Sequence, residues 1–227
     1  MTAIKTPKAA KKTNEPSGQV KYKVTLTLTE DMLGSAPKNV EVYKDYITQK
    51  ATSDQVSEEV TLIEDIEERG WTGFRSDENG LLLLDYQIRG FMKEQADALR
   101  ESNMLSARNA KDDGPVAGIK GKIDRHLFVA PRRLYICDAE TGNPLKTPDG
   151  IVERPLRAMT QQGPRVSLVR SDMVKAGRVL SFSLLTTWPQ VFTEEVIRQM
   201  FERGEFVGLG QWRNASHGRF TFTLARV

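Results

Sequence analysis

Hydrophobic periodicity changes twice within residues 178–227, and this pattern restricts the fold more than any other feature of the chain. Residues 178–188 (RVLSFSLLTTW) and 219–227 (RFTFTLARV) have the β-rich, alternating composition of strands. Between them, residues 193–204 (TEEVIRQMFERG) have helical spacing, with Thr193 as the expected N-cap and two glutamates in the first turn. A strand, a helix, a glycine-rich loop and a second strand in succession predict an α+β domain.

The first hundred residues continue the same pattern. Residues 20–29 (VKYKVTLTLT) alternate apolar and polar side chains, as a half-buried strand does. Residues 53–70 and 85–101 have helical spacing and predict two helices, the first of which ends at Gly70. The second helix is expected to bury one face, formed by Ile88, Phe91, Met92, Gln95, Ala96 and Leu99.

The middle of the chain changes from irregular to β-rich. Residues 102–124 have no sustained period and predict a long flexible loop. Residues 125–138 are β-rich but contain Pro131, which predicts either two short strands or one bulged edge strand. Residues 139–150 have the turn residues of a hairpin tip, and QQGP at 161–164 connects two further strands.

Composition and these segments together predict one domain. At 227 residues and 39% hydrophobic content the chain can bury a sizeable core. We expect a disordered basic arm at 1–18 and a single domain at 19–227. The domain is predicted to carry an acidic helical insertion at 41–80 and a β-hairpin insertion at 125–175.

Cysteine usage and hydropathy predict a cytoplasmic protein. Cys137 is the single cysteine, which excludes an intramolecular disulfide, and we interpret it as a small buried hydrophobe. The longest apolar run, Leu81–Leu84, is far shorter than the roughly 20 residues of a membrane span. The N-terminal residues lack the apolar core of a secretory signal.

Charge is unevenly distributed along the chain. Residues 41–85 contain twelve Asp or Glu against four Lys or Arg, whereas residues 119–178 contain twelve Lys or Arg against six acids. Residues 1–23 add six lysines against one glutamate. This asymmetry indicates an acidic lobe and a basic surface that attracts phosphates, although solvated faces of ordinary proteins also carry charge.

The glycine-rich segment GLGQWRNASHGRF, residues 208–220, is the first candidate site. Clustered glycines predict a sharp backbone turn or a close approach of ligand, with backbone amides able to cradle a phosphate. Its arginines suit phosphate oxygens and its tryptophan suits an unpaired base. In the alternative, Trp212 is buried core, Arg213 pairs with an acid of residues 41–85 and His217 is exposed loop. The candidate residues are Gly208, Gly210, Trp212, Arg213, His217, Gly218 and Arg219.

A second candidate site comprises arginines on the central strands, which would line a groove for single-stranded nucleic acid if they shared one face. Arg154 and Arg157 are three residues apart, so an unbroken strand puts them on opposite faces unless Pro155 introduces a bulge. About half of this set is therefore expected to be ordinary surface charge. Its members are Arg132, Arg133, Arg154, Arg157, Arg165 and Arg170.

Enzymatic interpretations find less support. His126 and His217 are the only histidines, and neither lies at metal-ligand spacing from other donors. The chain has no phosphate-binding lysine loop, no nucleophile elbow and no dinucleotide fingerprint, so no cofactor and no metal are predicted.

Three segments in order along the chain resemble the RAMP superfamily, the ferredoxin-like RNA-binding proteins of CRISPR interference complexes. The glycine-rich segment resembles that family's glycine-rich loop, and residues 83–99 resemble the opening of its first helix, with Arg89 and Gly90 at the positions of its basic residue and glycine. Residues 24–37 resemble its first strand and glycine turn. The chain departs from the family at residues 85–87, where Asp-Tyr-Gln replaces Gly-Ser-Ser, and in its acidic insertion. The whole chain, with its centre RPLRAMTQQGPRV, is similar to short proteins carried by phages and prophages.

The resemblance implies a ferredoxin-like or RRM-like core, an antiparallel sheet with helices on one face, and adds Arg89 and Lys93 to the candidate nucleic-acid contacts. The first hypothesis is a non-catalytic protein that binds single-stranded RNA or DNA, RNA being favoured, and assembles along it as a homo-oligomer or filament. The alternative is a phage assembly protein whose basic face meets another protein. A metal-independent endoribonuclease using His217 is the minor hypothesis.

Overall fold

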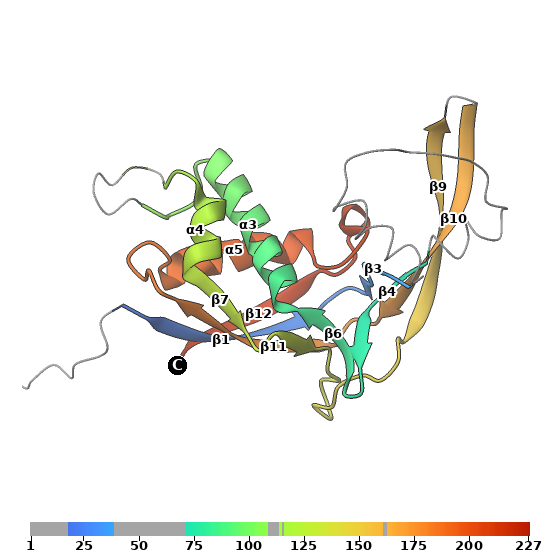
Figure 1. Cartoon of the computed structure of the whole chain (residues 1–227), viewed down its shortest axis with the longest axis horizontal. Helices are drawn as coiled ribbons and strands as arrows, with labels where there is room; N and C mark the ends of the chain where they lie inside the picture. The colour runs from blue at the N-terminus through green and yellow to red at the C-terminus, as the bar shows by residue number, and fades with distance from the viewer. Residues whose placement is uncertain (1–17, 39–70, 109–113, 115, 161–162) are drawn as a thin grey trace, which may run out of the picture.

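The computed structural model describes residues 18–38, 71–108, 114, 116–160 and 163–227 (Figure 1). Most of the predicted basic arm and residues 39–70, including the predicted helix at 53–70, lie outside these described residues. Within them the protein is α+β, with antiparallel pairing in its central sheet and three α-helices. No helix in this part of the chain is long and apolar enough to cross a membrane.

The central sheet has four antiparallel strands in the order β12-β1-β11-β7. Its strands are β1 (Val20–Leu28), β7 (Leu127–Ala130), β11 (Val179–Thr186) and β12 (Phe220–Arg226). The alternation predicted for the first strand is confirmed, because Tyr22, Val24, Leu26 and Leu28 are buried. Two long strands in the middle of the sheet thus form one wall of the core.

The helices pack on one face of this sheet (Figure 1). They are α3 (Asp85–Glu101), α4 (Ile119–His126) and α5 (Glu194–Val207). The buried face of α3 consists of the six residues that its period predicts. Helix α5 begins as predicted, with the Thr193 hydroxyl accepting a hydrogen bond from the amide of Val196 at 3.3 Å. Phe201 joins α5 to the sheet through rings of Phe182 and Phe222 at centroid distances of 6.3 and 5.4 Å.

Helix α4 corrects the prediction of a flexible loop over residues 102–124. Its eight residues contain two apolar side chains four apart, Ile119 and Ile123, and both are buried. Glycine and lysine supply the rest of the sequence, so the helical period is too short to stand out. Packing against α3 and β7 therefore stabilises a helix that local propensity does not favour.

A second sheet carries a long hairpin that projects away from the core (Figure 1). The hairpin pairs β9 (Gly150–Thr160) with β10 (Gly163–Val174). At its base, β10 also pairs with β2 (Met32–Leu33) and β4 (Trp71–Gly73), and β4 pairs with β3 (Ala36–Pro37). The hairpin is therefore attached to the rest of the molecule by short strands.

A third, small sheet is formed by β5 (Arg75–Asp77), β6 (Gly80–Leu84) and β8 (Arg133–Tyr135), in the order β5-β6-β8. Pro131 separates β7 from β8, which agrees with the expectation of two short strands. Strands β7 and β8 belong to different sheets. The β9–β10 hairpin covers residues 150–174 of the predicted insertion at 125–175. Residues 71–77, near the end of the predicted acidic insertion, contain β4 and β5 and no helix.

Candidate nucleic-acid interface

The glycine-rich loop between α5 and β12 folds tightly onto its own backbone. Gly210 and Gly218 have φ of 81° and 73°, a region that side chains with a Cβ avoid. A Cβ on Gly218 would lie 1.9 Å from the carbonyl oxygen of Leu209, and a Cβ on Gly210 would lie 2.4 Å from that of Leu33. These two glycines therefore serve the packing of the loop against itself and against β2.

Four backbone amides of this loop are not available for the phosphate cradle that the glycines predict. The amides of Leu209, Gln211 and Gly218 donate to the carbonyls of Gly218, Leu33 and Asp31 at 2.9, 3.1 and 2.9 Å. The amide of Gly208 donates to Gly204 at the end of α5. These four donors are satisfied within the protein and are not free to bind an anion.

Trp212 is the most prominent side chain of the loop. It has φ of 57°, and its side chain remains 40% exposed, so the alternative that it is buried core is wrong. Its ring stacks with that of His217, with centroids 5.1 Å apart and planes inclined by 25°. His217 is fixed in turn by a contact of 3.1 Å between its Nδ1 and the carbonyl oxygen of Asp31. The loop thus presents an aromatic pair at the surface.

Arg154 of β9 lies against the same indole. The guanidinium carbon is 4.7 Å from the centroid of the Trp212 ring. The side chain is only 7% exposed, and its Nε and Nη1 are buried without a hydrogen-bond partner among the described residues. Desolvation by burial lowers the pKa of Arg154. A cation–π contact at a desolvated site contributes about 2 kcal/mol. Burial of an ion costs several kcal/mol, so the contact with Trp212 stabilises the charge of Arg154 only in part.

Gln211 links the loop to the base of the hairpin. Its Oε1 accepts hydrogen bonds from Thr72 of β4 at 2.8 Å and Ser171 of β10 at 2.9 Å. Asp172, next to Ser171, is buried and accepts from Lys38 at 2.8 Å and from Trp71 Nε1 at 3.0 Å. None of these residues is distinctive in sequence, because small polar side chains such as Thr72 and Ser171 occur in most strands.

A cleft of about 230 Å³ separates the loop from the first half of α3. Gly208, Gly210 and Arg213 line it on the loop side, and Gly90 and Glu94 on the helix side. Nothing lies within 4 Å of the position where Gly90 would carry a Cβ, so this wall is open to a ligand. Arg213 donates to Glu94 of α3 at 2.8 Å, an acid outside the range 41–85 from which the alternative took its partner.

Four of the other predicted basic residues have partners within the protein. Arg89 pairs with Asp85 at 3.4 Å, Lys93 with Asp124 at 2.6 Å, and Arg133 with Asp77 at 2.9 Å. Arg219 donates to the carbonyl of Phe206 at 3.1 Å. Arg132 is exposed and directly precedes β8 of the third sheet. Arg89, Lys93, Arg133 and Arg219 are thus engaged within the protein, and a groove lined by the central arginines stays a prediction.

The hairpin register limits which central arginines share a face. Pairing runs without a bulge from Gly150 opposite Met173 to Thr160 opposite Gly163, so Pro155 does not shift the alternation. Positions 154 and 157 consequently belong to opposite faces of the hairpin. Position 165 lies opposite Ala158, and Arg170 lies opposite its ion-pair partner Glu153. Of the six central arginines, Arg154 is the one whose described side chain reaches the glycine-rich loop.

Comparisons with known proteins give structural matches only. No protein-family model and no curated protein matches the sequence. A chain of the Type III-B Cmr-beta complex bound to cognate target RNA is similar, with a TM-score of 0.46 and 11% identity over 92% of this chain and 61% of that one. A chain of the Type IV-B CRISPR complex is similar with a TM-score of 0.46 and 13% identity over 90% of each chain. This protein thus spans less than two thirds of the length of the first of these chains.

Proposed function

We propose that the protein binds single-stranded nucleic acid, RNA in preference to DNA, through the phosphate backbone and without catalysing a reaction on it. The observation that carries this proposal is the exposed Trp212 indole, which lies in contact with an arginine that no described carboxylate neutralises. An aromatic face next to a cation suits a nucleotide, because the base stacks while the phosphate is attracted. The adjoining cleft with its bare Gly90 wall gives the strand room to continue.

The strand order supports a ferredoxin-like core for this function. Along the chain, two halves repeat a strand, a helix and a strand: β1, α3, β7 and then β11, α5, β12. The four strands form a sheet in the order β12-β1-β11-β7, with the helices on one face. This order is compatible with the split βαβ arrangement that we propose for the core. The preference for RNA rests on the three RAMP-like segments.

Binding to labelled oligonucleotides tests the proposal. Fluorescence anisotropy would compare oligouridylate, oligothymidylate and duplex DNA at 50 and 200 mM salt. We expect Trp212→Ala to weaken single-strand binding about 10- to 100-fold, since stacking of one base contributes about 1–3 kcal/mol. Phe128→Ala on β7 is the matched control. Phe128 is 41% exposed, against 40% for Trp212, and lies on an edge strand of the central sheet.

Two results would contradict the proposal. One is duplex binding as tight as single-strand binding, because a paired base offers no free face to an indole. The other is equal loss in Trp212→Ala and Phe128→Ala, because the effect would then be general. Cleavage of the RNA that disappears in His217→Ala would favour the endoribonuclease hypothesis instead.

Assembly of several copies along the strand belongs to the same proposal, and the hairpin supports it. Val166 and Leu168 are 61% and 44% exposed on the hairpin face opposite to Arg154. Exposed apolar side chains on a projecting hairpin suit a protein contact. They also favour the second candidate function, phage assembly without nucleic acid. Leu168→Glu is expected to abolish association in sedimentation velocity, and association that requires no oligonucleotide would favour the second candidate.

A further inference from the structure

Arg154 is the buried arginine of the candidate interface, and no carboxylate among the described residues pairs with it. Arg89, Lys93, Arg133 and Arg213 each have a carboxylate within 3.4 Å. Arg154 is more deeply buried than any of them and has no such partner among the described residues. A buried cation without a counterion lowers stability, so its presence is explained more readily by a ligand than by folding.

The chemistry of Arg154 indicates what that ligand is. A guanidinium presents its donors in a planar fork that matches two oxygens of a phosphate. Two of its donor atoms, Nε and Nη1, are buried without partners, so the group has hydrogen bonds left to donate. Because the surroundings are already desolvated, an anion there would interact more strongly than at an exposed arginine. The Trp212 indole covers the group at 4.7 Å, next to the proposed position of a base.

We propose that Arg154 binds one phosphate group of the nucleic-acid strand, at a site which the Trp212 indole covers in the free protein. This inference rests on the proposed function and deepens it, because it assigns a specific phosphate contact to the junction of the hairpin and the glycine-rich loop. The indole moves off the guanidinium when the strand binds and stacks on the adjoining base. The site is therefore formed by two segments, β9 and residues 208–219, that are distant in sequence.

Substitution of Arg154 separates a binding role from a structural one. Arg154→Met keeps an unbranched side chain that fills the position of the arginine's apolar stem, and removes the guanidinium and its charge. We expect it to weaken binding of a 12-nucleotide oligouridylate about 10- to 100-fold, the effect of losing hydrogen bonds to a charged group. The slope of log K against log salt is expected to become shallower by about 0.7, the value for one phosphate contact on a single strand. Arg154→Lys is expected to restore the slope.

Thermal unfolding distinguishes a binding role of Arg154 from a structural one, because a structural role predicts a lower melting temperature for Arg154→Met. Without ligand, Arg154→Met is expected to melt at the same temperature as the wild type or higher, because an unpaired buried charge is removed. Arg170→Met is the matched control on the opposite face of the same hairpin, where Arg170 pairs with Glu153 at 2.8 Å. A lower melting temperature of Arg154→Met together with wild-type affinity and salt slope would overturn the inference.

Inorganic phosphate distinguishes failure of this inference from failure of the proposed function. At constant ionic strength, phosphate in place of chloride is expected to raise the melting temperature of the wild type and not of Arg154→Met. If no oligonucleotide binds but this difference is seen, the phosphate site stands and the proposed function fails. If oligonucleotides bind and Arg154→Met changes neither readout, the inference fails alone. Oligonucleotides with and without a 5′-phosphate then show whether a terminal or an internal phosphate occupies the site.

Discussion

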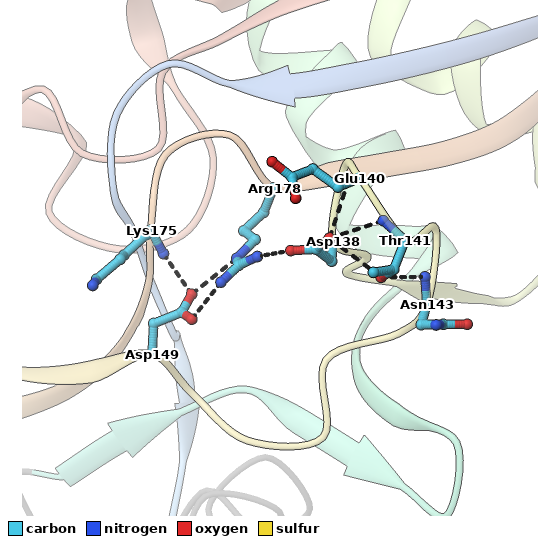
Figure 2. Close-up of polar contacts among 7 residues, drawn as sticks. All are labelled: Asp138, Glu140, Thr141, Asn143, Asp149, Lys175 and Arg178. Atoms are coloured by element: carbon cyan, nitrogen blue, oxygen red, sulfur yellow. Dashed lines mark hydrogen bonds and ion pairs between the residues drawn. The ribbon is translucent and has the colours of Figure 1, made fainter.

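Two arginines near the base of the hairpin have opposite surroundings. Arg178 precedes β11 and lies between two carboxylates, as Figure 2 shows: it pairs with Asp138 and, at 2.6 Å, with Asp149. Both acids are held in turn by backbone amides, Asp138 by those of Glu140 and Thr141 and Asp149 by that of Lys175. Arg154, on β9, has an indole and no described carboxylate.

The pKa shifts of the two arginines go in opposite directions. Hydrogen bonding to Asp149 raises the pKa of Arg178, with the charge of Asp138 adding to it, whereas desolvation lowers the pKa of Arg154. The protein therefore stabilises the charge of Arg178 and opposes that of Arg154. A cation with all its partners in place holds two loops together, and a cation without them is suited to an incoming anion.

The strongest test of this comparison removes each charge in turn. Arg178→Met leaves Asp138 and Asp149 with their amide hydrogen bonds but without their cation, and is expected to lower the free energy of unfolding. Arg154→Met is expected to leave the free energy of unfolding unchanged or to raise it. Urea unfolding of both variants measures the difference. Equal destabilisation would contradict the comparison, because Arg154 would then be as structural as Arg178.

A second test breaks the loop that holds Trp212 over Arg154. Gly218→Ala introduces a Cβ at φ of 73° and 1.9 Å from the Leu209 carbonyl, so we expect a loss of about 2 kcal/mol or more. Gly90→Ala is the matched control, because its Cβ meets nothing within 4 Å and lies in a helix. Alanine there is expected to raise stability by about 0.5–1 kcal/mol. Similar unfolding midpoints for the two variants would show that the loop is not tightly packed.

Sequence reasoning predicts the regular elements of this fold well and the site only in part. Strict alternation in β1 and the spacing of Ile88, Phe91 and Leu99 in α3 give both elements and their buried faces. Helix α4 escapes this reasoning because eight residues with two apolar positions carry too weak a period.

The site depends on contacts between distant segments. Trp212 and Arg213 are recognisable in the glycine-rich loop, but the partner of Arg213 is Glu94 on α3, 119 residues away. The contact of Trp212 with Arg154 depends on how the hairpin packs, which no local pattern encodes. The roles of the glycines are ambiguous for the same reason, since a tight self-contact and a ligand approach need the same residue.

We call the ion pairs of Arg178 with Asp138 and Asp149 the Arg178 junction, and the contact of Arg154 with the Trp212 indole the Arg154 junction. Acid is expected to weaken the first before the second. Hydrogen bonding to Arg178 lowers the pKa of Asp149 from its ordinary value of 3.8, and the amide of Thr141 is the main cause of the lowered pKa of Asp138. A lowered pKa means that these acids stabilise the fold above about pH 4, and that this stabilisation is lost as the pH falls through their folded-state values.

Urea unfolding between pH 6 and pH 2.5 measures this effect. In Asp149→Asn the fall in stability toward low pH is expected to be shallower than in the wild type, since one titrating group is gone. Asp85→Asn is the control, because Asp85 also pairs with an arginine but at 3.4 Å. A wild-type slope in Asp149→Asn would show that the Arg178 junction does not contribute to acid unfolding.

The smallest expected effect concerns Glu94, which gives Arg213 the partner that Arg154 lacks. Both side chains are substantially exposed, at 33% for Arg213 and 48% for Glu94, so the pair contributes about 0.5 kcal/mol or less to stability. When a strand enters the cleft as proposed, the Glu94 carboxylate competes with the strand's phosphate for Arg213 and repels that phosphate. Glu94→Gln is therefore expected to tighten single-strand binding severalfold at 50 mM salt and less at 200 mM, because screening weakens the repulsion. Glu194→Gln, which removes the acid of the exposed pair with Arg198 on α5, controls for the change in net charge. If Glu94→Gln weakens binding instead, Glu94 positions Arg213 for the strand, and the cleft resembles the Arg178 junction more than the Arg154 junction.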